Sequence, residues 1–235
     1  MGSSPDKLTP IQRDVLRAFF EVEPGFFLTG GAALAGFYLY HRETTDLDLF
    51  TMHAEAFERG RHALQAVADA LGATLVQRQH APGFERYVLT RGAEGVVVDL
   101  VWERAAQAYP EKAQVHGVRI DPPQEILINK LTTALSRSEE RDLVDLLFLE
   151  QAGYPVESAL AGALAKDGGC TPASLAWVLS QIEIPDGVVL PAGVPPARLR
   201  QFLADLVTRL RRAAAPAAGP IAVTRDPGGD AGRCG

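Results

Sequence analysis

Three aspartates give the clearest sign of chemistry in this 235-residue sequence. Asp46 and Asp48 stand two positions apart in the segment TTDLDLF, which we predict to be a β-strand. Their side chains then share one face of the strand, while Leu47 and Leu49 point to the core on the other. Asp99 interrupts the apolar run GVVVDLVW, where an unpaired ionised carboxylate would cost several kcal/mol. Asp99 therefore needs a compensating positive charge.

A divalent cation is the simplest partner for these carboxylates. If the strand of Asp99 lies beside the strand of Asp46 and Asp48, the three side chains converge. Ligation by oxygen alone favours Mg²⁺ or Mn²⁺ over zinc. The alternative leaves Asp46 and Asp48 on a solvated face and pairs Asp99 with an arginine. We expect the metal site, with Asp46, Asp48 and Asp99 as its catalytic ligands.

A pair of glycines precedes the first two aspartates. Gly30 and Gly31 follow the short apolar run 26–28, and we predict that they open a helix over about 32–41. Backbone N–H groups at a helix start attract anions, and glycine has no Cβ to keep a phosphate away. A carboxylate-held metal beside such a turn predicts a nucleoside triphosphate site, in which Mg²⁺ bridges the phosphates.

The elements that position these residues follow from hydrophobic periodicity and from helix and turn signals. Thr9 and Pro10 are typical of an N-cap and a first helical residue. Strands are expected at 26–28, 44–50, 73–79, 84–91 and 95–102, with a helix at 54–71 among them. From Asp121 onward the pattern indicates helices only, beginning near 124, after an N-cap at Ser138, and at 156–166, 171–182 and 196–212.

This change in pattern predicts the domain organisation. We expect a core over residues 1–123 and a helical domain over 124–212. Residues 213–235 are rich in Ala, Pro and Gly and have little to bury, so we expect a disordered tail.

The composition favours a soluble globular protein. The chain is 47% hydrophobic with a net charge of −6, and this acidity argues weakly against a polynucleotide partner. Cys170 and Cys234 are too few for a disulfide framework, and the five histidines lack metal-ligand spacing. No apolar run approaches the roughly 18 residues of a membrane span, and no signal segment opens the chain. We expect a cytoplasmic protein with no membrane association.

The segments GGAAL and HRETTDLDLF resemble the first motif of the AbiEii/AbiGii abortive-infection toxin family, a branch of the polymerase-β-like nucleotidyltransferases. The resemblance implies an α+β fold, with a mixed sheet flanked by helices and a helical C-terminal domain. Many members of the superfamily carry serine where this chain has Gly31, so a hydroxyl contact to phosphate is missing here. The motif falls on Gly30, Gly31, Arg42, Thr44, Asp46 and Asp48.

Later motifs of the family also have counterparts. Asp99 corresponds to the third carboxylate, and KLTTALSR and RDLVDLLFL correspond to the motifs of the helical half. By resemblance, Lys130 would contact the nucleotide phosphates, while Arg137, Asp142 and Asp145 would shape or line the site. The candidate nucleotide-binding residues are thus Gly30, Gly31, Arg42, Thr44, Lys130 and Asp145.

Three of these residues also have plainer interpretations. Without the resemblance, Lys130 would be a solvated helix residue, and Arg141 with Asp145 would be an i,i+4 ion pair. Arg42 could pair with Asp46 or with a helix C-terminus. We expect Arg42 to support the carboxylates structurally.

The predicted function is transfer of a nucleoside monophosphate from an NTP to an acceptor hydroxyl, with release of pyrophosphate. Asp99 would share a metal and lower the pKa of the hydroxyl or accept its proton. The resemblance implies a toxin whose acceptor is RNA, such as a tRNA end, or a protein, and whose partner is a separate antitoxin. Two alternatives stay open: a nucleotidyltransferase that modifies small antibiotics, whose polycationic substrates suit an acidic protein, and a regulatory nucleotide-binding module without turnover.

Overall fold

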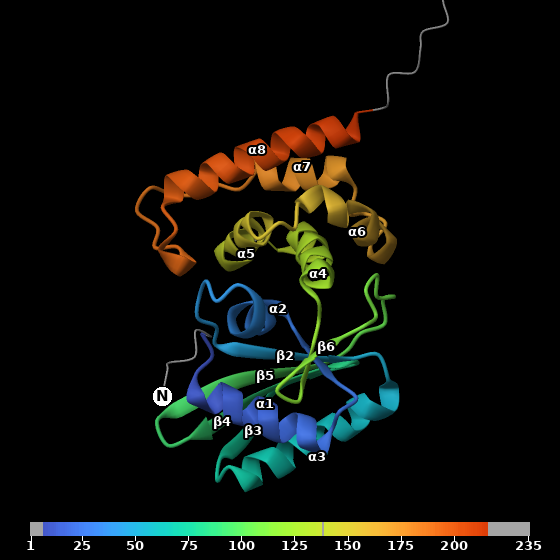
Figure 1. Ribbon diagram of the computed structural model, residues 1–235, viewed down its shortest axis with the longest axis vertical. Coiled ribbons are helices and arrows are strands. Elements are labelled where there is room, and N and C mark those ends of the chain that lie inside the picture. The colour runs from blue at the N-terminus through green and yellow to red at the C-terminus, as the bar shows by residue number, and fades with distance from the viewer. Residues whose placement is uncertain (1–6, 138, 216–235) are drawn as a thin grey trace, which may run out of the picture.

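The computed structural model describes residues 7–137 and 139–215, which form a sheet-containing half and a helical half (Figure 1). The strands lie between Phe27 and Ile120, and from Pro123 onward the described elements are helical. The fold is therefore α+β, as the sequence predicts.

The strands of the described ranges form one mixed seven-stranded sheet in the order β3-β4-β5-β2-β1-β7-β6. The pairs β2–β5 and β1–β7 are parallel, and the other neighbours are antiparallel. The five predicted strands are confirmed, and the short β6 and β7 are additional. The strands are β1 Phe27–Thr29, β2 Asp46–Thr51, β3 Thr74–Ala81, β4 Phe84–Arg91, β5 Glu94–Trp102, β6 Ala113–Val115 and β7 Val118–Ile120.

Helices α1 (Pro10–Val22) and α3 (Ala54–Ala70) cover one face of the sheet. Helix α1 starts where the sequence predicts, because Thr9 and Gln12 form a reciprocal capping box. Between these helices and the sheet lies a hydrophobic core that includes Leu47 and Leu49 of β2. The alternation along β2 therefore leaves Asp46 and Asp48 on the opposite face.

The helix after the glycine turn is shorter than predicted. Helix α2 (Gly30–Ala33) continues as a π-helix, η1 (Leu34–Tyr38), and both Leu39 and Tyr40 donate backbone hydrogen bonds to Leu34. Tyr40 has a positive φ of 52°, which ends the helical path. The following loop carries residues 41–45 back beneath the helical half.

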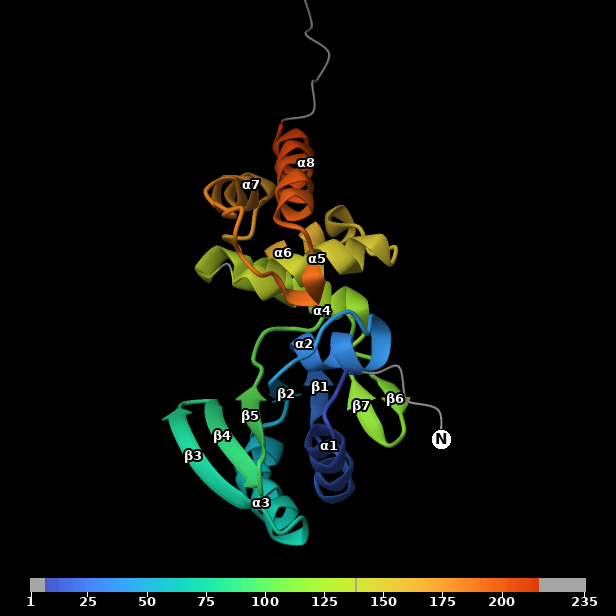
Figure 2. The same ribbon diagram turned by 90° about the vertical axis from the view of Figure 1, so that its left-hand side faces the viewer.

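The helical half stacks above the sheet, with α4 and α5 nearest to it (Figure 2). The predicted helices are confirmed, although α8 continues past residue 212. Ser138, the predicted cap, and residues 216–235 of the predicted tail lie outside the described residues. The elements are α4 Pro123–Ser136, α5 Glu140–Gln151, the 3₁₀-helix η2 Val156–Ala159, α6 Leu160–Lys166, α7 Pro172–Ser180, the 3₁₀-helix η3 Pro191–Gly193 and α8 Pro196–Ala214.

One continuous hydrophobic cluster includes side chains from both halves, so the division near residue 123 stays a prediction. None of the helices in the described ranges combines the length and the apolar character that crossing a bilayer requires.

Candidate active site

Four polar side chains form a transverse row across the sheet, on the face opposite α1 and α3. The strand registers align Arg86 of β4 with Asp99 of β5, Asp99 with Asp48 of β2, and Asp48 with Thr29 of β1. Strand β5 thus lies directly beside β2. This is the strand neighbourhood under which the sequence predicts that the carboxylates converge. Asp46 lies two residues from Asp48 on the same face.

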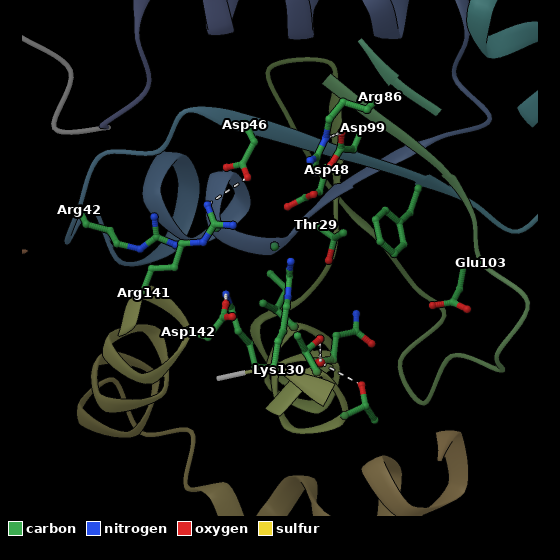
Figure 3. A pocket seen from close by; sticks show the side chains of 18 residues that line it. Thr29, Arg42, Asp46, Asp48, Arg86, Asp99, Glu103, Lys130, Arg141 and Asp142 are labelled. Carbon is green, nitrogen blue, oxygen red and sulfur yellow. Dashed lines mark hydrogen bonds and ion pairs between the residues drawn. The ribbon is translucent and has the colours of Figure 1, made fainter. Parts of the chain in front are cut away.

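This row forms the floor of a pocket of about 220 Å³ between the sheet and the helical half (Figure 3). Asp46, Asp48 and Asp99 reach the pocket from the sheet. Lys130 of α4 and Arg141 of α5 reach it from the opposite wall. Arg137, which follows α4, lines the pocket as well and pairs with Glu139 at 3.3 Å. The pocket therefore sets a carboxylate floor against a basic wall.

Asp48 differs from the other two carboxylates of the floor. No hydrogen bond or ion pair to its side chain occurs in the described part of the chain. Burial, and then the neighbouring charges of Asp46 and Asp99, raise the pKa of Asp48 to about 7. The ionised form of Asp48 is therefore electrostatically unfavourable, and a bound cation would stabilise it.

Asp46 is held by its own loop and by the helical half. Thr44 Oγ1 donates a hydrogen bond to Asp46 Oδ1 at 2.8 Å, and Arg141 Nη1 approaches Asp46 Oδ2 at 3.3 Å. The backbone of Thr44 is fixed in turn by a hydrogen bond from Gln12 of α1 (2.9 Å). Thr44 itself is buried and does not line the pocket, so it orients Asp46.

Asp99 is paired with an arginine, which the sequence analysis raised as an alternative. Arg86 Nε and Nη2 donate to the two oxygens of Asp99 at 2.8 and 2.7 Å. Arg86 was not among the residues predicted from the sequence. The signal that could have identified it is the two-residue turn at Gly92 and Ala93, because this turn fixes the β4–β5 register and so places Arg86 opposite Asp99.

Asp145 lies behind the pocket and not in it. This fully buried carboxylate accepts hydrogen bonds from His41 Nε2 (2.7 Å) and from Arg42 Nε and Nη2 (2.7 and 2.8 Å). Burial alone would raise the pKa of Asp145, but Lys130, Arg42 and His41 hold it well below its usual range. Arg42 is thus paired with Asp145 and not with Asp46. Its role as a structural support stays a prediction.

Lys130 is buried in the wall of the pocket and is not a solvated helix residue. Its Nζ lies 2.6 Å from Asp142 Oδ1 and 2.6 Å from Asp145 Oδ2. Burial favours the neutral amine, but Asp145 and Asp142 raise the pKa of Lys130 above its ordinary value. Lys130 therefore presents a fixed positive charge opposite the carboxylate floor.

The structure gives a steric reason for both glycines of the turn. Gly30 has a φ of +65°, and a Cβ there would overlap the carboxylate of Asp48. A Cβ on Gly31 would lie 2.6 Å from Arg42 Nη2, whose guanidinium is held by Asp145. The glycines therefore make room for Asp48 and Arg42. Both also line the pocket.

The carboxylates fit a divalent cation in part. In the described ranges Asp48 is unpaired, and Asp46 accepts one hydrogen bond from Thr44 and one longer contact from Arg141, so oxygen ligands are present at the floor. In the described ranges no three acidic, histidine or cysteine side chains form a ready metal-binding group. Asp99 is already engaged, because both of its oxygens accept hydrogen bonds from Arg86. A third carboxylate ligand would require this pair to open.

The pocket thus combines facing aspartates on adjacent strands, a glycine turn and a basic wall, and the family to which the chain belongs gives its class. The chain belongs to the family described as nucleotidyl transferase AbiEii toxin of type IV toxin–antitoxin systems, whose model matches residues 14–218. It is therefore a nucleotidyltransferase of a toxin–antitoxin family.

Solved structures share the fold. A candidate nucleotidyltransferase from H. pylori superposes with a TM-score of 0.52 at 18% sequence identity, covering 86% of this chain and 94% of that chain. The JHP933 protein from Helicobacter pylori gives a TM-score of 0.51 at 18% identity, with coverages of 87% and 92%. No curated protein matched the sequence.

Proposed function

We propose that this protein transfers a nucleoside monophosphate from an NTP to an acceptor hydroxyl, with the help of a divalent cation. The observation that carries the proposal is Asp48. It is an unpaired carboxylate with a raised pKa, in register with Asp99, at the floor of a pocket whose other wall is basic. Such a floor suits a cation, and such a wall suits the phosphates that the cation accompanies.

In the proposed reaction the acceptor oxygen forms a bond to the α-phosphorus, and the bond from that phosphorus to the β-phosphate oxygen breaks. Pyrophosphate leaves, and the hydroxyl loses its proton. Lys130 and Arg141 neutralise charge on the phosphates, and Arg137 extends this basic wall. Thr44 keeps Asp46 aimed at the pocket, while Asp145 holds Lys130 and Arg42 in place.

Mg²⁺ or Mn²⁺ would be held by Asp46 and Asp48, and by Asp99 once Arg86 leaves it. When bound, the cation would neutralise phosphate charge and lower the pKa of the acceptor hydroxyl. While Arg86 donates hydrogen bonds to both oxygens of Asp99, these oxygens are not free to contact the acceptor hydroxyl. The proton-accepting role of Asp99 thus depends on the release of Arg86.

The family supports a toxin with a separate antitoxin as partner. For the acceptor we propose RNA, such as a tRNA end, or a protein side chain.

The test is to offer each of the four α-³²P-labelled NTPs with Mg²⁺ to bulk tRNA, to the protein itself and to an aminoglycoside. We expect label on RNA or protein, dependent on Mg²⁺. Label on the aminoglycoside alone would favour an antibiotic-modifying enzyme. Absence of label from every acceptor, with nucleotide binding intact, would favour a regulatory module.

The matched variants are Asp48→Asn, which removes the unpaired charge, and Asp69→Asn, which changes an exposed residue of α3. We expect Asp48→Asn to lose transfer and Asp69→Asn to retain it. Equal transfer by both variants would contradict the proposed site.

A further inference from the structure

Two aspartates near the pocket are each held by an arginine through two hydrogen bonds, but the two pairs differ in exposure. In the Arg42–Asp145 pair the side chains are 6% and 0% exposed. In the Arg86–Asp99 pair the arginine is 41% exposed and the aspartate only 6%. The first pair is enclosed on both sides, whereas the second joins a buried carboxylate to a side chain at the surface.

This difference decides which partner can leave. Arg86 makes no other hydrogen bond or ion pair in the part of the chain that the structure describes. Because much of its side chain already meets solvent, Arg86 can turn away without losing hydration. Asp99 is buried in a strand and cannot follow, so its ionised form requires a replacement cation.

Arg86 also lies near an aromatic ring while it is paired with Asp99. The ring of Phe84, two residues earlier on β4, lies with its centroid 5.6 Å from Arg86 Cζ. A guanidinium near an aromatic face keeps a favourable interaction in water. This contact does not involve Asp99, so breaking the ion pair does not by itself remove it.

We propose that Arg86 is an exchangeable counter-ion, which neutralises Asp99 in the resting protein and competes with the divalent cation for that carboxylate. This inference rests on the proposed function, because it requires that Asp99 becomes a ligand. Arg86 is then a positioning residue. It keeps the third carboxylate occupied until a cation displaces it, and so sets the concentration of cation at which the site assembles.

The test measures Mn²⁺ binding to the full chain without nucleotide, by electron paramagnetic resonance of the free ion. Removing the competitor in Arg86→Gln should tighten Mn²⁺ binding roughly 5- to 30-fold, which corresponds to about 1–2 kcal/mol. Arg86→Lys keeps the charge but cannot donate the same pair of hydrogen bonds, so it should tighten binding about 2- to 5-fold. This second variant also covers the case in which Arg86→Gln fails to fold.

The control is Arg91→Gln on the same strand, because Arg91 pairs with Asp14 and Glu94 and does not line the pocket. It should leave Mn²⁺ affinity within twofold of the parent. In an Asp99→Asn background, Arg86→Gln should no longer change the affinity, since the contested carboxylate is gone.

The outcomes separate this inference from the proposed function. If Asp48→Asn abolishes Mn²⁺ binding but neither Arg86 variant changes it, the metal site stands and the exchange is wrong. If neither the parent nor any Arg86 variant binds Mn²⁺, both are wrong. Tighter binding that persists in the Asp99→Asn background would also overturn the exchange, because Arg86 would then act on some other group.

Discussion

Replacing Asp48 with asparagine should stabilise the protein in the absence of divalent cations, although it removes a site residue. Burial and the charges of Asp46 and Asp99 raise the pKa of Asp48 to about 7, from the ordinary 3.8. That difference corresponds to as much as about 4 kcal/mol of unfavourable free energy when Asp48 is fully ionised. Solvent screening and movement of the neighbouring carboxylates reduce this, so we expect a gain of about 1–3 kcal/mol at pH 8.5.

The sign of the pH dependence follows from the raised pKa. Between about pH 4 and pH 7 the folded protein holds a proton on Asp48 that the unfolded chain has already lost. The contribution of Asp48 to stability therefore falls as the pH rises through this range. The asparagine in Asp48→Asn does not titrate. The free energy of unfolding of this variant should therefore equal that of the parent near pH 4 and exceed it above pH 7.

The assay is urea unfolding of both proteins at pH 4.5 and pH 8.5 in a buffer with a metal chelator, with Asp69→Asn as an exposed control expected to stay within about 0.5 kcal/mol. A variant that is no more stable than the parent at pH 8.5 would refute the reasoning. An equal gain at both pH values would do so too, because charge would not be its cause. Added Mg²⁺ should stabilise the parent and Asp69→Asn but not Asp48→Asn.

Three further variants test other parts of the site. Asp99→Asn should retain nucleotide binding but slow single-turnover transfer about 10²- to 10⁴-fold, and a rate within about threefold of the parent would exclude Asp99 from the chemistry. Gly30→Ala should cost more unfolding free energy than Gly72→Ala, since both have a positive φ but only Gly30 faces a carboxylate; equal costs in urea melts would contradict the crowding by Asp48. Asp145→Asn should destabilise the protein by about 3–5 kcal/mol in the same melts, because it strips a buried charge from Lys130 and Arg42, and a loss below about 1 kcal/mol would show that these partners find other contacts.

Hydrophobic periodicity predicted the larger elements well. The alternation in β2 and the capping signal at Thr9 are local features, so the sequence carries them openly. The strands β6 and β7 could not be predicted in the same way. Each has three residues, and β6 is exposed throughout, so neither gives an alternation long enough to distinguish a strand from a loop. Their structure depends on pairing, since β7 pairs with β1 and β6 pairs with β7.

The site was predictable in its residue types but not in its pairings. The carboxylates Asp46, Asp48 and Asp99 stand out because charge interrupts apolar strands. The plainer interpretation of Asp145, an i,i+4 ion pair with Arg141, does not hold, because Arg141 reaches Glu139 and Asp46. Helical spacing describes an isolated helix, and contacts between residues about 100 positions apart override it.

The division of the pocket between two segments has a consequence for how the protein is made. A nascent chain that has emerged as far as Ile120 contains all seven strands of the sheet. These strands carry all three carboxylates of the floor. Lys130 and Arg141 are still to be synthesised, as is Asp145, which anchors Arg42. A polypeptide released from the ribosome at that stage thus lacks the basic wall of the pocket. If the proposed function holds, interrupted translation would release no active enzyme, and the activity would be present only in chains synthesised through α5.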